Sequence, residues 1–292
     1  MTLPRFQYNE PASLAEACQM IRAFGEKAAL LAGGTDLLVK MRNRERQPQE
    51  IVSLAELEEM TQISAAGGRH AIGACCTVSQ IAASMEVKST FPALASGAEH
   101  LGSPAVRNIG TIGGNIVTAS PSADLPPALV AYGAEVRLKS EDQERFLPLE
   151  ELFRGPGDTC IKKDEILADL RLESPPEVSG AGFFKLGNRR ALQISIVNGA
   201  CYFALNPGSG EIEKARVVLG AVAPTLVRAV SAESLLVGEK PGKGLFQEAG
   251  RAAALDCSPI DDLRGSAAYR RDMIQVLTCR TLQTALDEIR NH

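Results

Sequence analysis

Two glycine-marked stretches contain the residue types best suited to binding chemistry. The first is 31-LAGGTDLL-38 and the second is 109-IGTIGGN-115. Glycine accepts backbone conformations with positive φ, which lets successive N–H groups converge on one anion. A helix that begins just after such a turn adds its N-terminal N–H groups and its dipole. Two such turns would suit a diphosphate, which carries charge on two adjacent phosphorus centres.

Phosphate binding is one interpretation of these stretches, and a simple tight loop also needs a Gly-Gly pair. No Lys followed by Ser or Thr comes after the first pair, as it would in a Walker loop, and neither stretch contains G-x-G-x-x-G. Asp124 follows the second stretch and could bind a ribose or ribityl hydroxyl. It could equally be an acid in the first turn of a helix, where the dipole favours it.

The composition excludes several other classes of function. A formal net charge of −4 does not fit a nucleic-acid or anionic-membrane surface. No apolar run approaches the roughly 18 residues of a membrane span, and the N-terminus has no apolar segment typical of a signal peptide. We therefore expect a cytoplasmic protein without a membrane span.

The cysteines and histidines do not indicate metal or triad chemistry. The seven cysteines form no CxxC pair, and the three histidines lie far apart in sequence. We expect the cysteines to be small buried apolar residues. We expect neither a metal site nor a histidine-based catalytic triad.

The first glycine stretch lies at a junction of predicted helices and strands. The pattern predicts a helix over 13–24 that starts at Ser13, a strand over 28–32, a helix capped by Thr35, and a strand over 51–54. This order of elements makes a small α/β unit.

The second glycine stretch belongs to a second predicted α/β unit. The Gly67-Gly68 pair predicts the turn of a hairpin over 62–74, and two prolines at 126 and 127 fit the first turn of a helix. The other elements are predicted helices over 78–85, 93–101 and 124–132 and strands over 134–138, 145–148 and 166–172.

The stretch 173-ESPPEVSG-180 is the best candidate for a linker. Beyond it the pattern predicts a mostly antiparallel three-stranded sheet and then helices. The strands are predicted over 181–186, 195–205 and 216–222, and the helices over 231–237, 245–254 and 269–289. The sequence thus predicts an α+β protein divided into 1–55, 56–175 and 178–292.

Four stretches in this order and spacing resemble a known family. They are 32-AGGTDLL-38, 102-GSPAVRNIGTIGGNI-116, 120-SPSADLPPALVA-131 and 182-GFFKLGNRRALQISIVN-198. Together they resemble the FAD-binding medium subunit of the molybdenum hydroxylases, which include xanthine, nicotinate and carbon monoxide dehydrogenases. The stretch 153-FRGPGDTCIKKDEIL-167 resembles the xanthine-dehydrogenase-like branch. The resemblance implies two N-terminal FAD-binding subdomains of the vanillyl-alcohol-oxidase-like fold and a C-terminal domain of the carbon monoxide dehydrogenase flavoprotein type.

The resemblance also implies which residues contact FAD. The first motif would wrap the diphosphate, the second would supply another cradle, and Asp124 would hold the ribityl or ribose region. Lys185 would lie near the isoalloxazine, where a cation stabilises the anionic reduced flavin. The full implied set is Leu30, Leu31, Ala32, Gly33, Gly34, Thr35, Asp36, Leu37, Leu101, Thr111, Ile112, Gly113, Gly114, Asn115, Asp124, Ile166, Leu167 and Lys185.

By the same resemblance, this chain would be an oxidoreductase subunit that transfers electrons and needs no catalytic residue of its own. A large partner subunit would carry molybdopterin and a small one two [2Fe–2S] clusters. Electrons would pass from the clusters through FAD to NAD or another acceptor. A dimer of heterotrimers is the family pattern.

Two features depart from patterns within the family. Many relatives carry Asp-Ile-Ala where this chain has 193-QIS-195, so Gln193 supplies no negative charge there. Relatives that reduce benzoyl-type thioesters carry a cysteine-rich insertion that holds an iron–sulfur cluster. Here 115-NIVTASPSADLPP-127 contains no cysteine, so we expect no cluster in this chain.

Two other functions remain open at this point. One is a self-contained FAD oxidase or reductase of the same flavin-binding superfamily, which would need acid–base residues over the flavin. The other is a flavin-free assembly protein that kept the fold. Flavin content separates the second from the rest, and co-purification with molybdenum and iron–sulfur subunits separates the first.

Overall fold

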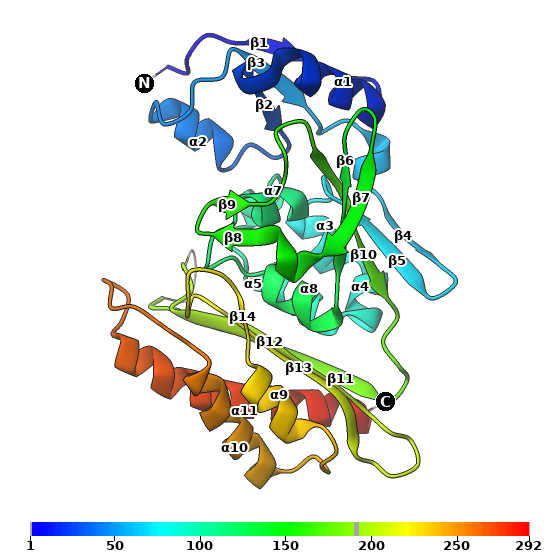
Figure 1. The fold of residues 1–292 in the computed structure, drawn as a ribbon, viewed down its shortest axis with the longest axis vertical. Helices are drawn as coiled ribbons and strands as arrows, with labels where there is room; N and C mark the ends of the chain where they lie inside the picture. The colour runs from blue at the N-terminus through cyan, green and yellow to red at the C-terminus, as the bar shows by residue number, and fades with distance from the viewer. Residues whose placement is uncertain (1, 190–192, 292) are drawn as a thin grey trace.

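The computed structural model describes residues 2–189 and 193–291, and its elements stack in three layers along the long axis (Figure 1). The N-terminal layer lies at one end, a middle layer holds the second glycine stretch, and the C-terminal sheet with its helices forms the other end. The predicted boundaries 1–55, 56–175 and 178–292 stay a prediction, although each of the three larger sheets draws its strands from one of these ranges.

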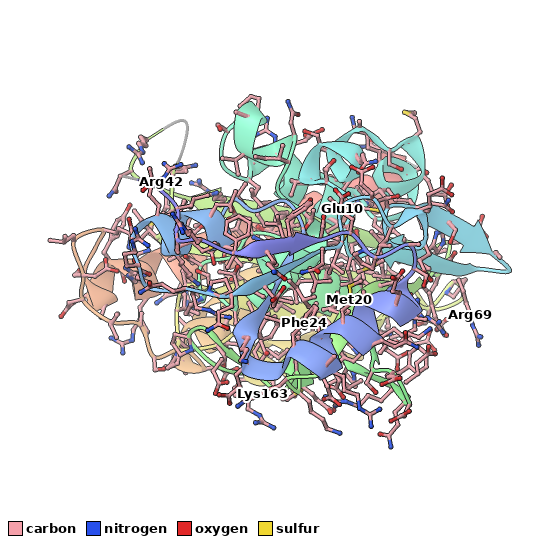
Figure 2. The ribbon with its side chains drawn as sticks, turned by 90° about the horizontal axis from the view of Figure 1, so that it is seen from above. Glu10, Met20, Phe24, Arg42, Arg69 and Lys163 are labelled. Carbon is pink, nitrogen blue, oxygen red and sulfur yellow. The ribbon has the colours of Figure 1, made fainter. Side chains whose placement is uncertain are left out.

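The N-terminal layer is a parallel three-stranded sheet with the order β1-β3-β2. Its elements are β1 (Gln7–Asn9), α1 (Leu14–Phe24), a 3-10 turn (Gly25–Lys27), β2 (Ala28–Leu31), α2 (Leu37–Arg42) and β3 (Glu50–Ser53). The predicted start of α1 is confirmed, because the Ser13 hydroxyl accepts a hydrogen bond from the Glu16 N–H. Figure 2 shows this end from above, with Met20 and Phe24 on α1 and Lys163 beside the C-terminal end of that helix.

The middle layer is built on an antiparallel five-stranded sheet with the order β4-β5-β10-β6-β7. Its strands are β4 (Ile63–Ala66), β5 (Arg69–Gly73), β6 (Glu135–Lys139), β7 (Glu144–Pro148) and β10 (Ile166–Glu173), and a small pair joins β8 (Phe153–Gly155) and β9 (Asp158–Thr159). The predicted hairpin is confirmed, since Gly67 and Gly68 both take positive φ between β4 and β5.

Short helices of the middle layer surround this sheet. They are α3 (Val78–Ala83), α4 (Met85–Thr90), α5 (Pro92–His100), α6 (Pro104–Arg107), α7 (Ile112–Val117) and α8 (Pro126–Tyr132), with 3-10 turns at Glu58–Met60 and Leu149–Leu152. The helix α4 was not predicted. It starts where the Ser84 hydroxyl caps the Val87 N–H and ends before Pro92, the first residue of α5.

The C-terminal sheet has both faces covered. Its strands β11 (Ser179–Leu186), β12 (Val197–Leu205) and β13 (Ile212–Gly220) are the three predicted ones, and a short β14 (Val227–Arg228) is added at the edge. One face contacts α5 and α8 of the middle layer, and the other contacts α9 (Val230–Leu236) and α11 (Ala267–Asn291), with α10 (Lys243–Leu255) packed on these two helices. Eight of the nine β12 residues are therefore buried, which explains its nearly continuous apolar sequence.

Two predicted helix starts differ from the structure. Thr35 does not cap α2, because the helix begins at Leu37 after Asp36, and Asp36 makes no side-chain capping bond. The helix α8 begins at Pro126 rather than Asp124. Asp124 thus lies outside the first turn, and the interpretation of this residue as an acid favoured by the helix dipole is wrong.

Candidate functional site

The two glycine stretches lie against each other in the tertiary structure. Gly33 packs so closely on the second stretch that a Cβ atom placed on it would lie 1.8 Å from the carbonyl oxygen of Ile109. A Cβ atom placed on Gly110 would lie 3.6 Å from the hydroxyl oxygen of Thr35. The two motifs, far apart in sequence, therefore form one continuous surface.

The first stretch leaves a run of backbone N–H groups without partners. Among the described residues, no acceptor takes a hydrogen bond from the N–H groups of residues 33–37. Gly34 has φ +71°, and the Leu38 N–H donates to the Gly34 oxygen at 3.1 Å as α2 begins. Unpaired N–H groups are rare in protein interiors, and Gly33 and Gly34 are half-buried. A run of free N–H groups at a positive-φ turn is an arrangement that binds anions.

In the second stretch, the Thr111 N–H has no acceptor among the described residues, and the other N–H groups are used within the protein. Four successive groups donate to protein oxygens: Ile112 to Cys76 at 3.0 Å, Gly113 to Ala74 at 2.8 Å, and Gly114 and Asn115 to the hydroxyl and carbonyl oxygens of Thr111 at 3.1 and 3.0 Å. Gly113 and Gly114 both lie inside α7 without positive φ. The expected convergence of free N–H groups through positive φ is therefore absent from this pair.

Two features of the second stretch are available for contact with a ligand. Gly114 is exposed on α7. The side-chain oxygen Oδ1 of Asn115 is buried and has no hydrogen-bond partner within residues 2–189 and 193–291. Since buried polar atoms nearly always find a partner, this oxygen indicates a missing donor at the site.

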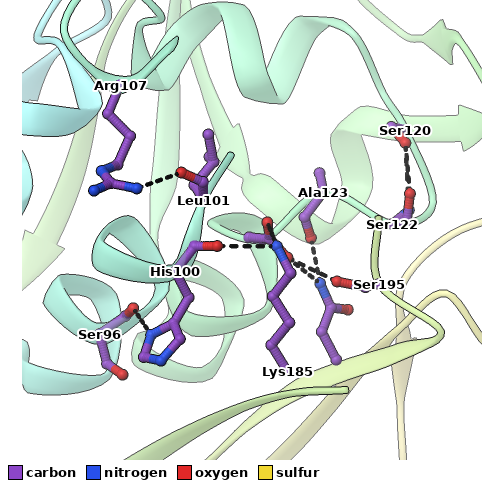
Figure 3. Close-up of polar contacts among 11 residues, drawn as sticks. Ser96, His100, Leu101, Arg107, Ser120, Ser122, Ala123, Lys185 and Ser195 are labelled. Atoms are coloured by element: carbon purple, nitrogen blue, oxygen red, sulfur yellow. Dashed lines mark hydrogen bonds and ion pairs between the residues drawn. The ribbon is translucent and has the colours of Figure 1, made fainter. Parts of the chain in front are cut away.

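A buried polar network joins the middle layer to the C-terminal sheet (Figure 3). Lys185 Nζ donates to Asp124 Oδ2 at 2.5 Å and to the carbonyl oxygen of His100 at 3.0 Å. Asp124 Oδ1 accepts from the Ser195 hydroxyl at 2.9 Å and from Asn198 Nδ2 at 3.0 Å. Opposite charges at this separation stabilise each other in a buried setting only with such additional hydrogen bonds.

The other implied contact residues divide into a surface group and a core group. Leu101 is half-buried after α5, and its carbonyl oxygen accepts from Arg107 at 2.9 Å (Figure 3). Leu30 and Ala32 pack partly exposed against the main core. Ile166 and Leu167 are instead 1% and 5% exposed in β10 and lie in that core. Leu31 and Leu37 pack on a small cluster around Ala29, Met41 and Ile51.

Ser195 and Asn198 belong to the polar network but were not among the predicted site residues. Both are fully buried. A signal for Asn198 was present, because a lone amide within an apolar strand must find a partner when the strand is buried. The identity of that partner, Asp124, could not be obtained from the sequence.

Ser174, His70 and Glu86 lie in a row that the sequence did not predict. The Ser174 hydroxyl lies 2.8 Å from His70 Nε2, and the Glu86 carboxylate lies 3.2 Å from His70 Nδ1. Among the described residues, His70 Nδ1 makes no hydrogen bond of suitable geometry, so the acid is not aligned as it is in a catalytic triad. The Ser174 N–H already donates to the Gly68 oxygen at 2.8 Å, and two prolines without N–H groups follow. Through these two hydrogen bonds, Ser174 connects the linker to the β4–β5 hairpin.

The cysteines behave as the sequence predicted for five positions. Cys18, Cys75, Cys76, Cys201 and Cys257 are buried, while Cys160 and Cys279 are half-buried. Burial raises the pKa of Cys75 to about 12 and that of Cys76 to about 11. Within residues 2–189 and 193–291, no three His, Cys, Asp or Glu residues cluster as metal ligands. In the same ranges, no helix has the length and apolar character needed to cross a membrane.

Comparison with known proteins assigns both halves of the chain. Residues 4–174 match the family described as FAD binding domain in molybdopterin dehydrogenase, and residues 182–285 match the CO dehydrogenase flavoprotein C-terminal domain. The chain is 31% identical to the carbon monoxide dehydrogenase medium chain of Hydrogenophaga pseudoflava, with 98% of each protein covered. It is 30% identical to the nicotine 6-hydroxylase medium subunit of Paenarthrobacter nicotinovorans, with 98% of this chain and 99% of the relative covered.

A solved structure gives the same result. Carbon monoxide dehydrogenase from Hydrogenophaga pseudoflava, in a form that lacks the Mo-pyranopterin moiety of the molybdenum cofactor, superposes with a TM-score of 0.91 at 32% identity. The superposition covers 98% of this chain and 99% of that one. The chain therefore belongs to the family of FAD-binding medium subunits of the molybdopterin dehydrogenases.

Proposed function

We propose that this chain holds FAD at the junction of its two glycine motifs and transfers electrons between a [2Fe–2S] partner subunit and NAD or another acceptor. The observation that carries the proposal is the run of unpaired N–H groups at residues 33–37. When bound, FAD supplies the redox chemistry, because its ring can accept two electrons from one partner and deliver them to another.

The first motif is the diphosphate-binding half of the proposed site. Its free N–H groups present donors without adding a countercharge, and the start of α2 contributes its positive dipole end. The tight contact of Gly33 with Ile109 holds this loop against the second motif. Asn115 Oδ1 offers an acceptor next to it, suited to a hydroxyl or amino donor of the cofactor.

Asp124 and Lys185 are the proposed contacts for the polyol and ring. Lys185 brings a positive charge from the C-terminal sheet into the buried network at its junction with the middle layer. A cation beside the flavin ring would favour the form with more electron density and so raise its reduction potential. The chain's own contribution is thus placement and electrostatics.

The partner subunits are proposed from the relatives. The proteins to which the chain is similar are medium chains or subunits of carbon monoxide dehydrogenase and nicotine 6-hydroxylase. We propose a large partner that carries molybdopterin and a small partner that carries [2Fe–2S] clusters. A xanthine-dehydrogenase-like complex with NAD as the acceptor is the most specific form of this proposal.

An absorbance titration of the purified chain with FAD, with FMN as the control ligand, tests cofactor binding. We expect saturable FAD binding with shifted flavin bands and much weaker FMN binding, because FMN lacks the diphosphate and adenosine. The chain co-expressed with its partner subunits provides the second arm. Absence of flavin from that complex would contradict the electron-transfer role.

The acceptor is tested separately by anaerobic addition of NADH to the flavin-loaded complex. If NAD is the physiological acceptor, NADH reduces the bound flavin in the reverse direction and its absorbance near the visible maximum is bleached. A complex that is bleached by its reducing substrate but not by NADH would refute NAD and leave another acceptor.

A further inference from the structure

We infer that Ser195 and Asn198 are positioning residues that restrict Asp124 to one remaining hydrogen-bond acceptor site, placed beside one remaining N–H of Lys185. A single cofactor hydroxyl could use both, because it can donate to Asp124 and accept from Lys185. The inference rests on the proposed FAD site and adds residues that the glycine motifs and the implied contact set do not include.

The acceptor capacity of Asp124 can be counted from its contacts. Each carboxylate oxygen has two lone pairs directed at donors. Oδ1 accepts from Ser195 at 2.9 Å and from Asn198 at 3.0 Å, so both of its acceptor positions are filled. Among the described residues, Oδ2 accepts from Lys185 alone, at 2.5 Å. One acceptor position therefore remains, and it is on Oδ2.

The donor capacity of Lys185 can be counted in the same way. The ammonium group has three N–H donors. One donates to Asp124 and a second to the carbonyl oxygen of His100 at 3.0 Å. The third N–H has no acceptor in the part of the chain that the structure describes.

The unused acceptor position and the unused N–H lie on Asp124 Oδ2 and Lys185 Nζ, two atoms that are already hydrogen-bonded to each other. A hydroxyl both donates and accepts at one oxygen atom, so it can donate to Asp124 Oδ2 and accept from Lys185 Nζ. FAD carries such groups on its ribityl chain and on its ribose. A carbonyl or a phosphate oxygen could use only the Lys185 position and would face the carboxylate without a proton between them.

The C-terminal domain fixes Ser195 and Asn198 in place. Asn198 Nδ2 also donates to the carbonyl oxygen of Ala123 at 2.9 Å, which aligns its amide with the chain next to Asp124. Arg270, 2% exposed in α11, donates to the carbonyl oxygen of Ile196 at 2.8 Å. The backbone beside Ser195 is thereby held by a buried guanidinium, and the C-terminal sheet controls how Asp124 is oriented.

The test measures the FAD dissociation constant of the full chain and of Ser195→Ala. Losing one hydrogen bond of this kind corresponds to about 1 kcal/mol, which is roughly a fivefold weaker affinity. In an Asp124→Asn background, the same Ser195→Ala change should alter the affinity by less than about twofold. A role limited to stabilising the fold would give the same effect in both backgrounds and would overturn the inference.

Two further variants make the result specific. Thr281→Val removes a buried hydroxyl that donates to Leu277 in α11, away from Asp124, and should leave FAD affinity unchanged. If Ser195→Ala fails to fold, Ser195→Cys keeps the side-chain volume while sulfur donates only weakly. An unchanged FAD affinity in a folded Ser195→Cys variant would overturn the inference.

Riboflavin and ADP, titrated separately, distinguish the two sources of the hydroxyl. If the ribityl chain supplies it, Ser195→Ala weakens riboflavin binding and spares ADP, and the reverse holds for the ribose. If Ser195→Ala weakens neither riboflavin binding nor ADP binding, the inference is contradicted, while the proposed function still stands. If the wild-type chain in its complex binds no FAD, the proposed function fails and this inference fails with it.

Discussion

The two glycine motifs look alike in sequence and differ in what their backbone does. In the first, the N–H groups of residues 33–37 have no acceptor among the described residues. In the second, the N–H groups of Ile112, Gly113, Gly114 and Asn115 are all used by protein oxygens. The first Gly-Gly pair therefore leaves N–H donors without protein acceptors and also allows a close backbone contact at Gly33, whereas the second pair allows a close contact at Gly113 with its N–H groups already bonded.

The difference follows from where each pair lies relative to its neighbours. Gly34 takes a positive φ in a loop that ends before α2. Gly113 has ordinary helical geometry within α7, and a Cβ atom there would lie 2.7 Å from both the Cβ and the oxygen of Ala74. A glycine pair thus indicates that space or conformation is limiting, and only the surroundings show which of the two applies.

The largest effect is expected for Gly33→Val, which breaks the contact between the motifs. Any Cβ at this position would lie 1.8 Å from the Ile109 oxygen, so the two backbones must separate. We expect destabilisation of about 3 kcal/mol and FAD affinity lowered by at least about 100-fold. Thermal denaturation and FAD titration measure the two quantities. FAD affinity equal to that of the wild type would contradict the site.

Gly244→Ala is the matched control for that substitution. Gly244 lies in α10, and outside the helix backbone a Cβ atom there would have no described atom within 4 Å. We expect unchanged FAD affinity and slightly higher stability, because alanine is favoured over glycine inside a helix.

Gly113→Ala should affect stability more than cofactor binding. The added methyl group would overlap Ala74, which costs about 1–3 kcal/mol. Because the Gly113 N–H is already bonded to the Ala74 oxygen at 2.8 Å, no donor to the cofactor is lost. The measurement is a denaturant titration with a parallel FAD titration at a temperature where the variant is folded. A large loss of affinity without loss of stability would show that this motif acts directly on the cofactor.

Thr111→Val removes the N-cap of α7 while nearly conserving side-chain volume. The Thr111 hydroxyl accepts from the Gly114 N–H at 3.1 Å, and loss of such a cap costs about 1 kcal/mol. We expect a lower melting temperature, measured by circular dichroism. A variant as stable as the wild type would show that the second motif does not depend on its internal hydrogen bonds.

Gly114→Ala should give the smallest change in stability in the second motif, and it should raise stability where Gly113→Ala and Thr111→Val lower it. Gly114 is exposed on α7, and outside the helix backbone an added Cβ would meet one described atom within 4 Å, the Thr111 hydroxyl oxygen at 3.0 Å, which must shift by a few tenths of an ångström. Alanine in a helix is favoured by about 0.5–1 kcal/mol. If FAD lies over this face, its affinity falls even though the protein becomes more stable. Equal affinity would place the cofactor away from α7.

Local features of the fold were predictable because the residues that decide them are neighbours. The Ser13 cap of α1 and the Gly67-Gly68 hairpin turn were both recognised from a few adjacent residues. The three long strands of the C-terminal sheet were recognised from apolar runs. The short helix α4 was missed because its start depends on a single serine between two other helices.

The site was predictable only in outline. The resemblance implied that both glycine motifs, Asp124 and Lys185 contact FAD, and the structure places the two motifs against each other. Their direct contact was not predicted. Asp124 is 61 residues from Lys185 in the chain, so nothing in their local sequence shows that they pair. The role of Thr35 as a helix cap was wrong because α2 begins two residues later.

The sequence by itself determined the order of the longer helices and strands and the two glycine motifs, because these depend on local conformational preferences and on apolar periodicity. The tertiary structure alone decided which N–H groups remain free and which carboxylate oxygen remains open. The acceptors for the second motif come from Ala74 and Cys76, and the donors to Asp124 come from the C-terminal domain. Hydrogen-bond capacity is used up by whichever groups the fold brings within about 3 Å, and that proximity exists only after the layers have packed.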